Sequence, residues 1–204
     1  MSIVFYRAPM SSATPVYWAL NELGVPFEEV KLDLAQGEQK KPEFLKLNPN
    51  GKVPTLVVDG TPMFEALAIM QYLGDRFGVE KKLWPATNDP QRLQALSWTT
   101  WSYVSVGRAV GALFLSRAEQ FGKPNPAQIA YAEKELQSLI GILDGRLAQK
   151  PFLLSDQFSL ADLVVSSVIG WVTMNQVTLD AHPHVSDWLA RCQGRPSAKA
   201  SWGQ

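Results

Sequence analysis

The sequence predicts two consecutive parts, an α/β domain with a mixed four-stranded sheet and then an all-α bundle. Hydrophobic residues in the first 78 positions alternate between short strand-like runs and helical spacing. An Asp-Gly pair at residues 59–60 indicates a tight hairpin between antiparallel strands. From about residue 89 onward the spacing of hydrophobic residues is helical throughout. These three observations together define the predicted fold class.

The first part begins with a strand, a helix and a second strand. Residues 3–6 form a short apolar run that is typical of a buried strand. Apolar residues between 16 and 23 recur on one helix face, and Gly24 ends this predicted helix. Residues 27–32 then have the pattern of a second strand. Because a single helix separates the two strands, we expect them to lie parallel with a right-handed crossover.

A hairpin and one more helix complete the first part. Strands are expected on both sides of residues 59–60, followed by a helix with apolar residues from Ile69 to Phe77 that ends near Gly78. The resulting order is strand, helix, strand, connection, hairpin and helix. This is the order of a thioredoxin-like domain.

The second part consists of amphipathic helices around one apolar helix. Hydrophobic stripes run through residues 129–147 and 185–192, whereas residues 160–172 are apolar on every side and predict a buried central helix. A short charged segment ending in Pro85 separates the two parts. We therefore expect domains at residues 1–78 and 89–204, joined by a linker at 79–88.

The composition excludes several classes of function. Nineteen basic and nineteen acidic residues balance, so the net charge is zero and neither nucleic acid nor an anionic membrane is an expected partner. The single cysteine, Cys192, has no disulfide partner in the chain, which fits a reducing compartment. No apolar stretch is long enough to suggest a membrane span or a signal segment. These features predict a cytoplasmic protein.

Four segments resemble the motifs of one enzyme superfamily. Residues 48–56 read Asn-Pro-Asn-Gly-Lys-Val-Pro-Thr-Leu, and residues 64–69 read Phe-Glu-Ala-Leu-Ala-Ile. Together they resemble the glutathione-site signature of the glutathione S-transferase superfamily, in a bacterial-type cytosolic member. Residues 152–162 resemble the folding motif of its C-terminal domain, and residues 188–197 resemble the end of its last helix. The resemblance implies an enzyme that adds the glutathione thiolate to a small apolar electrophile.

The resemblance also implies how the tripeptide is bound. Val53 would pair like a strand with the cysteinyl part of glutathione, next to a cis Pro54. Glu65 would accept the ammonium group, and the backbone amide of Ala66 would meet the γ-glutamyl carboxylate. The family usually has serine at this last position, so glutathione binding is expected to be weaker here. Lys40 or Lys52 would hold the glycyl carboxylate.

The residue that ionises the thiol is left open among three hydroxyls. In Ser- and Cys-type members the activating residue stands where this chain has Met10. Ser11 and Ser12 follow directly, at a helix N-terminus that favours an anion, and Ser11 is the first choice. Tyr6 is the runner-up, because tyrosine ends the first strand in tyrosine-type classes. Helix capping is the structural alternative for both serines.

The helical domain is expected to supply the electrophile pocket. Candidate pocket residues are Met10, Tyr103, Arg108 and Trp171. By resemblance alone we expect a homodimer with a role in detoxification. No metal site is expected, because His182 and His184 lie near no cysteine or acid cluster. The replacements at Met10 and Ala66 also allow an alternative, a transferase-like binding or regulatory protein without turnover.

Overall fold

The structure, a computed structural model, describes residues 1–119 and 122–202 of the 204-residue chain. The chain forms two compact units. The first extends from Met1 to Ala86 and takes in the C-terminal segment from Gly194, and the second extends from Thr87 to Gln193. The expected limits of 1–78, 79–88 and 89–204 stay a prediction.

The first unit contains the predicted mixed four-stranded sheet. The strands are β1 (Ile3–Arg7), β2 (Glu28–Lys31), β3 (Thr55–Val58) and β4 (Thr61–Phe64), in the order β2-β1-β3-β4. β1 pairs parallel with β2 and antiparallel with β3, and β3 pairs antiparallel with β4. The helices are α1 (Thr14–Glu22), the short turns η1 (Glu38–Lys40) and α2 (Pro42–Leu45), α3 (Ala66–Leu73) with a π-helical turn η2 (Gly74–Gly78), and α9 (Pro196–Trp202). The predicted fold class of this part is confirmed.

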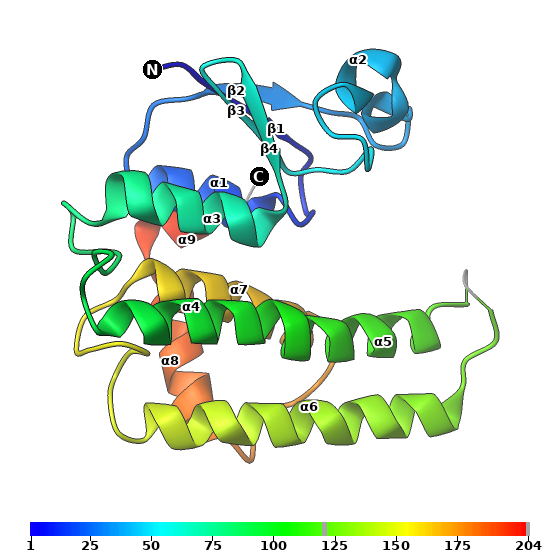
Figure 1. The fold of residues 1–204 in the computed structure, drawn as a ribbon. Helices are drawn as coiled ribbons and strands as arrows, with labels where there is room; N and C mark the ends of the chain where they lie inside the picture. The colour runs from blue at the N-terminus through cyan, green and yellow to red at the C-terminus, as the bar shows by residue number, and fades with distance from the viewer. Residues whose placement is uncertain (120–121, 203–204) are drawn as a thin grey trace. The chain divides into compact units, whose positions relative to one another are not determined.

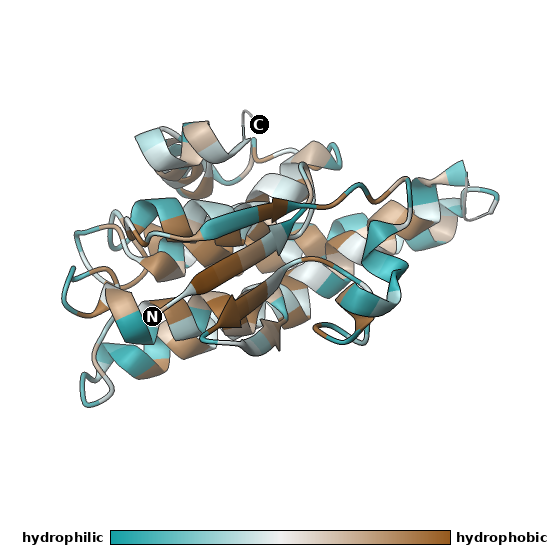
Figure 2. Ribbon diagram, turned by 90° about the horizontal axis from the view of Figure 1, so that it is seen from above, coloured by the Kyte–Doolittle hydropathy of each residue, from teal (hydrophilic) through white to brown (hydrophobic). Residues whose placement is uncertain are grey.

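The central strands of the sheet are buried, and helices cover one of its faces. α1 and α3 pack side by side beneath this face, as Figure 1 shows. Phe5 of β1 is fully buried on the α1 side, where its ring stacks with that of Tyr17. Figure 2 shows that β1 and β3 are mostly hydrophobic, whereas the edge strand β2 is mostly hydrophilic. This contrast fits a sheet whose middle is buried and whose edge is exposed.

The β3–β4 hairpin fixes which loops lie together. Asp59 and Gly60 form its predicted turn, with φ angles of 47° and 83°. Thr55, at the start of β3, pairs with both Tyr6 of β1 and Phe64 of β4. The chain therefore leaves β1, enters β3 and leaves β4 at the same end of the sheet.

The second unit is all helical, as predicted. Its helices are α4 (Gln91–Trp101), a π-helical turn η3 (Ser102–Val106), α5 (Gly107–Arg117), α6 (Pro126–Leu147), α7 (Leu160–Met174) and α8 (Pro183–Gln193). α5 and α6 lie side by side (Figure 1). α7 is buried on nearly all sides, which confirms the predicted central helix. No helix in the described part of the chain is long and apolar enough to cross a membrane.

A buried carboxylate organises the start of α7. Ser159 and Asp162 form a capping box. The Asp162 carboxylate also accepts hydrogen bonds from the backbone N–H of Leu153 at 2.8 Å and from the indole N–H of Trp188 at 2.9 Å. Burial raises the pKa of Asp162 above its usual value, against the effect of these donors. Asp162 thus ties α8 and the preceding loop to the central helix.

The C-terminal segment is clasped to α1 within the first unit. Arg195 donates from Nε to Glu22 at 3.1 Å and forms an ion pair with it, and the hydroxyl of Ser197 also donates to Glu22. The indole N–H of Trp18 donates to the Ser197 hydroxyl at 3.1 Å. The Glu22 side chain is only 8% exposed. These bonds anchor helix α9 to α1.

Candidate functional site

The three loops at one end of the sheet meet around the Val53-Pro54 peptide. This peptide bond is cis, as the resemblance implied, and both residues are buried. The carbonyl oxygen of Val53 accepts a hydrogen bond of 2.8 Å from the Ser12 hydroxyl, in the loop between β1 and α1. Pro54 stands directly before Thr55, the residue that pairs with Phe64, so Glu65 follows at the same end of the hairpin. The register thus gathers residues that are far apart in the sequence.

Asn48 shapes the turn that leads to Val53. Its buried side-chain amide donates to the Lys52 carbonyl at 2.7 Å and to the Thr55 hydroxyl at 3.1 Å. Its side-chain oxygen accepts from the backbone N–H of Asn50 at 3.1 Å. Asn48 therefore holds both sides of the turn, a role that its place in the sequence motif did not reveal.

The two adjacent serines have different partners. The Ser11 hydroxyl donates to the Ala8 carbonyl at 2.7 Å and accepts from the backbone N–H of Ala13 at 3.2 Å. Both bonds are local and close the turn before α1. The N-cap residue of α1 is Ala13, which has no side-chain capping hydrogen bond from the described residues. The Ser12 hydroxyl instead reaches across to Val53, and Ser12 is exposed. Of the two hydroxyls, Ser12 is the one that the fold brings to the cis-proline loop.

Tyr6 and Met10 have other surroundings. The Tyr6 ring contacts the ring of Phe44 in α2, with 5.7 Å between centroids. Its hydroxyl makes no hydrogen bond to any residue that the structure describes. Met10 has a left-handed backbone with φ of 49°, and its side chain is 59% exposed. A non-glycine residue rarely adopts this conformation.

Glu65 and Ala66 lie where β4 turns into α3. Glu65 is exposed and has φ of 71° and ψ of 113°, directly before the first helical residue. Within the described part of the chain, Glu65 at the N-cap makes no side-chain capping hydrogen bond to α3. Ala66 is 5% exposed and supplies a methyl group where a hydroxyl is usual. The helix start nonetheless favours an anion through its backbone N–H groups and dipole.

Lys40 lies over the turn at Gly51. Its ammonium donates to the Asn50 carbonyl at 3.3 Å, and a Cβ added to Gly51 would lie 2.8 Å from Lys40 Nζ and 2.9 Å from the Gln39 carbonyl oxygen. Gly51 also has a positive φ of 58°. The side-chain oxygen of Gln39 is buried and has no partner among the described residues. Lys52 follows in the same turn with an exposed side chain.

The candidate pocket residues of the second unit lie on different helices. Trp171 of α7 is 37% exposed, and its ring lies 3.7 Å from where a Cβ at Gly111 of α5 would stand. Arg108 forms an ion pair with Glu135 of α6. Tyr103 lies in the π-helical turn η3.

Cysteine and metal chemistry has little support in the described residues. Cys192 is fully buried in α8. Among residues 1–119 and 122–202, no group of three or more His, Cys, Asp or Glu side chains is arranged to hold a metal ion.

The fold and the site define a thioredoxin-like protein with a helical second unit and a cis-proline loop before β3. The family model "Glutathione S-transferase, N-terminal domain" matches residues 1–75, and "Glutathione S-transferase, C-terminal domain" matches residues 108–196. The chain therefore belongs to the glutathione S-transferase family, whose co-substrate is glutathione.

Several curated proteins are similar over nearly their whole length. Glutathione S-transferase F6 of Arabidopsis thaliana is 32% identical over 206 residues, which cover 97% of this chain and 97% of that protein. The disulfide-bond oxidoreductase YfcG of Escherichia coli (strain K12) is 29% identical over 207 residues, with 96% and 92% covered.

Solved structures have the same fold. Poplar glutathione transferase F1 matches with a TM-score of 0.87 and 27% identity, over 100% of this chain and 97% of that one. The glutathione transferase URE2P6 of Phanerochaete chrysosporium, solved with oxidized glutathione, matches with a TM-score of 0.89 over 99% and 95%. At 24% identity, this match shows that the two chains share a fold and carries nothing further.

Proposed function

We propose that this protein is a glutathione transferase that ionises the thiol of glutathione and adds it to a small apolar electrophile. The observation that carries the proposal is the hydrogen bond between the Ser12 hydroxyl and the Val53 carbonyl, beside the cis Val53-Pro54 peptide. A peptide that pairs with the backbone of Val53 by strand addition would bring its cysteinyl side chain close to this hydroxyl.

The ends of the tripeptide have charged and polar partners in the same loops. The Glu65 carboxylate is suited to the ammonium of the γ-glutamyl group, and the N-terminus of α3 at Ala66 is suited to the neighbouring carboxylate. The ammonium groups of Lys40 and Lys52 are suited to the glycyl carboxylate at the other end.

Ionising the glutathione thiol requires little free energy from the protein. A free thiol has a pKa near 8.5, and lowering it by one unit takes about 1.4 kcal/mol. A hydrogen bond to a charged group supplies about 1.5–3 kcal/mol, so one hydroxyl is sufficient to favour the thiolate. We assign this role to Ser12, because its hydroxyl reaches the Val53 carbonyl beside the cis-proline peptide. Ser11 is committed to its own turn, and Tyr6 packs on Phe44.

The remaining features of the proposal rest on the family. Met10, Tyr103, Arg108 and Trp171 are proposed to contact the electrophile, and Met10 and Trp171 support this by exposing large apolar side chains. We also propose a homodimer that acts in the cytoplasm in detoxification. The lone cysteine fits a reducing compartment.

Disulfide reduction is a second candidate, favoured by the similarity to a protein named disulfide-bond oxidoreductase. Since Cys192 is fully buried, a protein thiol is a poor nucleophile here. Two glutathione thiols would instead reduce one disulfide to two thiols and leave as oxidized glutathione. The Ser12 hydroxyl would favour the attacking thiolate in this reaction as well.

Calorimetry and turnover test the proposal together. Glutathione should bind the wild-type protein, and a chlorodinitrobenzene should be conjugated with a kcat/KM that falls about tenfold to a hundredfold in Ser12→Ala. The matched Ser11→Ala and Tyr6→Phe variants should keep most of this activity. Turnover of a small dialkyl disulfide, with none of the chloroarene, would favour the second candidate. No binding heat at millimolar glutathione would overturn both.

A further inference from the structure

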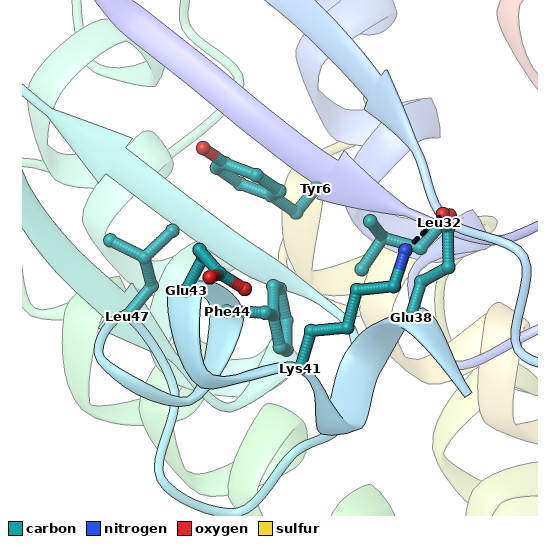
Figure 3. A pocket seen from close by; sticks show the side chains of 7 residues that line it. All are labelled: Tyr6, Leu32, Glu38, Lys41, Glu43, Phe44 and Leu47. Carbon is teal, nitrogen blue, oxygen red and sulfur yellow. Dashed lines mark hydrogen bonds and ion pairs between the residues drawn. The ribbon is translucent and has the colours of Figure 1, made fainter.

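A hollow lies in the first unit, on the sheet face away from α1. Phe5 and Arg7 of β1 both contact the Tyr17 ring of α1, so Tyr6 between them faces the opposite side. There the Tyr6 ring meets Phe44 of α2. The hollow has a volume of about 200 Å³. Its lining consists of Tyr6, Leu32, Glu38, Lys41, Glu43, Phe44 and Leu47 (Figure 3).

Of the candidate residues for the glutathione site, the hollow includes only Tyr6, the runner-up for the activating hydroxyl. Neither Ser12 nor Val53 nor Glu65 lines it. A ligand in the hollow would therefore bind in addition to glutathione and not in its place.

The walls of the hollow suit a flat apolar body. The rings of Tyr6 and Phe44 meet edge to face, with 61° between their planes. Phe44 is buried, whereas Leu32 and Leu47 are half-buried and keep part of their surface toward the opening. Half-buried aliphatic and aromatic surface of this kind gains from contact with an apolar ligand.

The charges at the rim do not balance. Lys41 Nζ lies 3.0 Å from a carboxylate oxygen of Glu38, which neutralises that pair. Glu43 makes no hydrogen bond or ion pair with any residue in the described ranges. Figure 3 shows its carboxylate between Leu47 and Phe44, on the side opposite the Lys41–Glu38 pair. The lining therefore carries one uncompensated negative charge beside two aromatic rings.

We propose that this hollow binds a small organic cation, an amine carried on an apolar ring. The ring of the ligand contacts Leu32, Leu47 and the aromatic pair, and its ammonium lies at the Glu43 carboxylate. A cation is attracted both by the carboxylate and by the faces of aromatic rings.

The test uses benzylammonium as the probe and benzyl alcohol as its neutral counterpart. In amide NMR titrations of the full chain, benzylammonium should shift resonances of β1, residue 32 and residues 38–47. It should bind about tenfold more tightly than benzyl alcohol. Glu43→Gln should remove this difference, whereas Glu80→Gln, which changes an exposed carboxylate elsewhere in the same unit, should retain it.

Three outcomes overturn the proposal. If benzylammonium and benzyl alcohol bind with equal affinity, the charge of the ligand plays no part in binding. If Glu43→Gln and Glu80→Gln weaken benzylammonium binding equally, the effect reflects only the net charge of the protein. Shifts that map to Ser12, Val53 and Glu65, or that disappear on adding glutathione, place the probe in the other site.

Discussion

At the residue scale, the proposed chemistry depends on which hydroxyl can donate a hydrogen bond to a thiolate. A hydroxyl has one proton, so a donor already bonded within a turn must break that bond to serve a ligand. Ser11 would have to break the bond that closes the turn before α1. Ser12 would exchange its hydrogen bond to the Val53 carbonyl for one to the ligand. The sequence showed both serines at the helix start, and only the fold separates their roles.

Ala66 provides a direct test of the helix start as an anion site. Ala66→Ser would add a hydroxyl donor at the N-terminus of α3 for the γ-glutamyl carboxylate. The dissociation constant of glutathione, measured by calorimetry, should fall about tenfold. Ala68→Ser, two residues further along the same helix, should leave the constant unchanged. An Ala66→Ser protein that binds no more tightly would contradict the assigned position of the carboxylate.

At the scale of elements, the turn from Asn48 to Val53 presents the ligand-binding backbone. Asn48 forms hydrogen bonds to both sides of this turn, and Gly51 allows a left-handed backbone conformation beneath Lys40. The motif predicted that these residues belong together. It did not predict that Lys40 rests on the Asn50 carbonyl, because such a contact depends on the path of residues 33–47.

Gly51→Ala tests this turn, and Gly37→Ala is its matched control. Both glycines have positive φ angles, 58° and 70°, but a Cβ meets atoms within 4 Å only at Gly51. Each variant should lose about 1–2 kcal/mol in free energy of unfolding, measured in urea, from the backbone conformation. Only Gly51→Ala should also weaken glutathione binding, since it displaces Lys40 and the Gln39 carbonyl. Equal glutathione affinity in both variants would exclude the turn from the site.

At the scale of the whole molecule, the end of the chain is tied back to the first unit through Glu22. Burial alone would raise the pKa of Glu22, but the hydrogen bonds from Arg195 and Ser197 outweigh it and hold the pKa below the ordinary value of 4.5. The bonds of ionised Glu22 therefore contribute fully to the free energy of unfolding above that pH. This contribution is lost as the pH falls through the lower pKa of the folded state.

Hydrogen exchange of the α9 backbone amides measures how strongly the bonds of Glu22 stabilise α9. After correction for the intrinsic rate, wild-type exchange should be slow at neutral pH and should accelerate as the pH falls below 4.5. Glu22→Gln should exchange about tenfold faster at neutral pH and should lose most of the acid dependence. Acid dependence that persists in Glu22→Gln would assign the effect to another group.

The order of elements, the parallel β1–β2 pair, the hairpin and the central helix were all predictable, because each has a local signal in residue spacing or turn chemistry. Contacts that join distant segments had no such signal. The bond from Ser12 to Val53 and the clasp from Glu22 to Arg195 span 41 and 173 residues. Tyr6 illustrates the same limit, since strand alternation alone does not say which face meets α1.

The most direct test of the central claim is the pKa of the glutathione thiol in the complex, measured from the ultraviolet absorbance of the thiolate as the pH is varied. The account predicts a pKa lowered by at least about one unit in the wild-type complex. In the Ser12→Ala complex it predicts a value near that of the free thiol. An unchanged lowering in Ser12→Ala, or an ordinary pKa in the wild-type complex, would contradict the account.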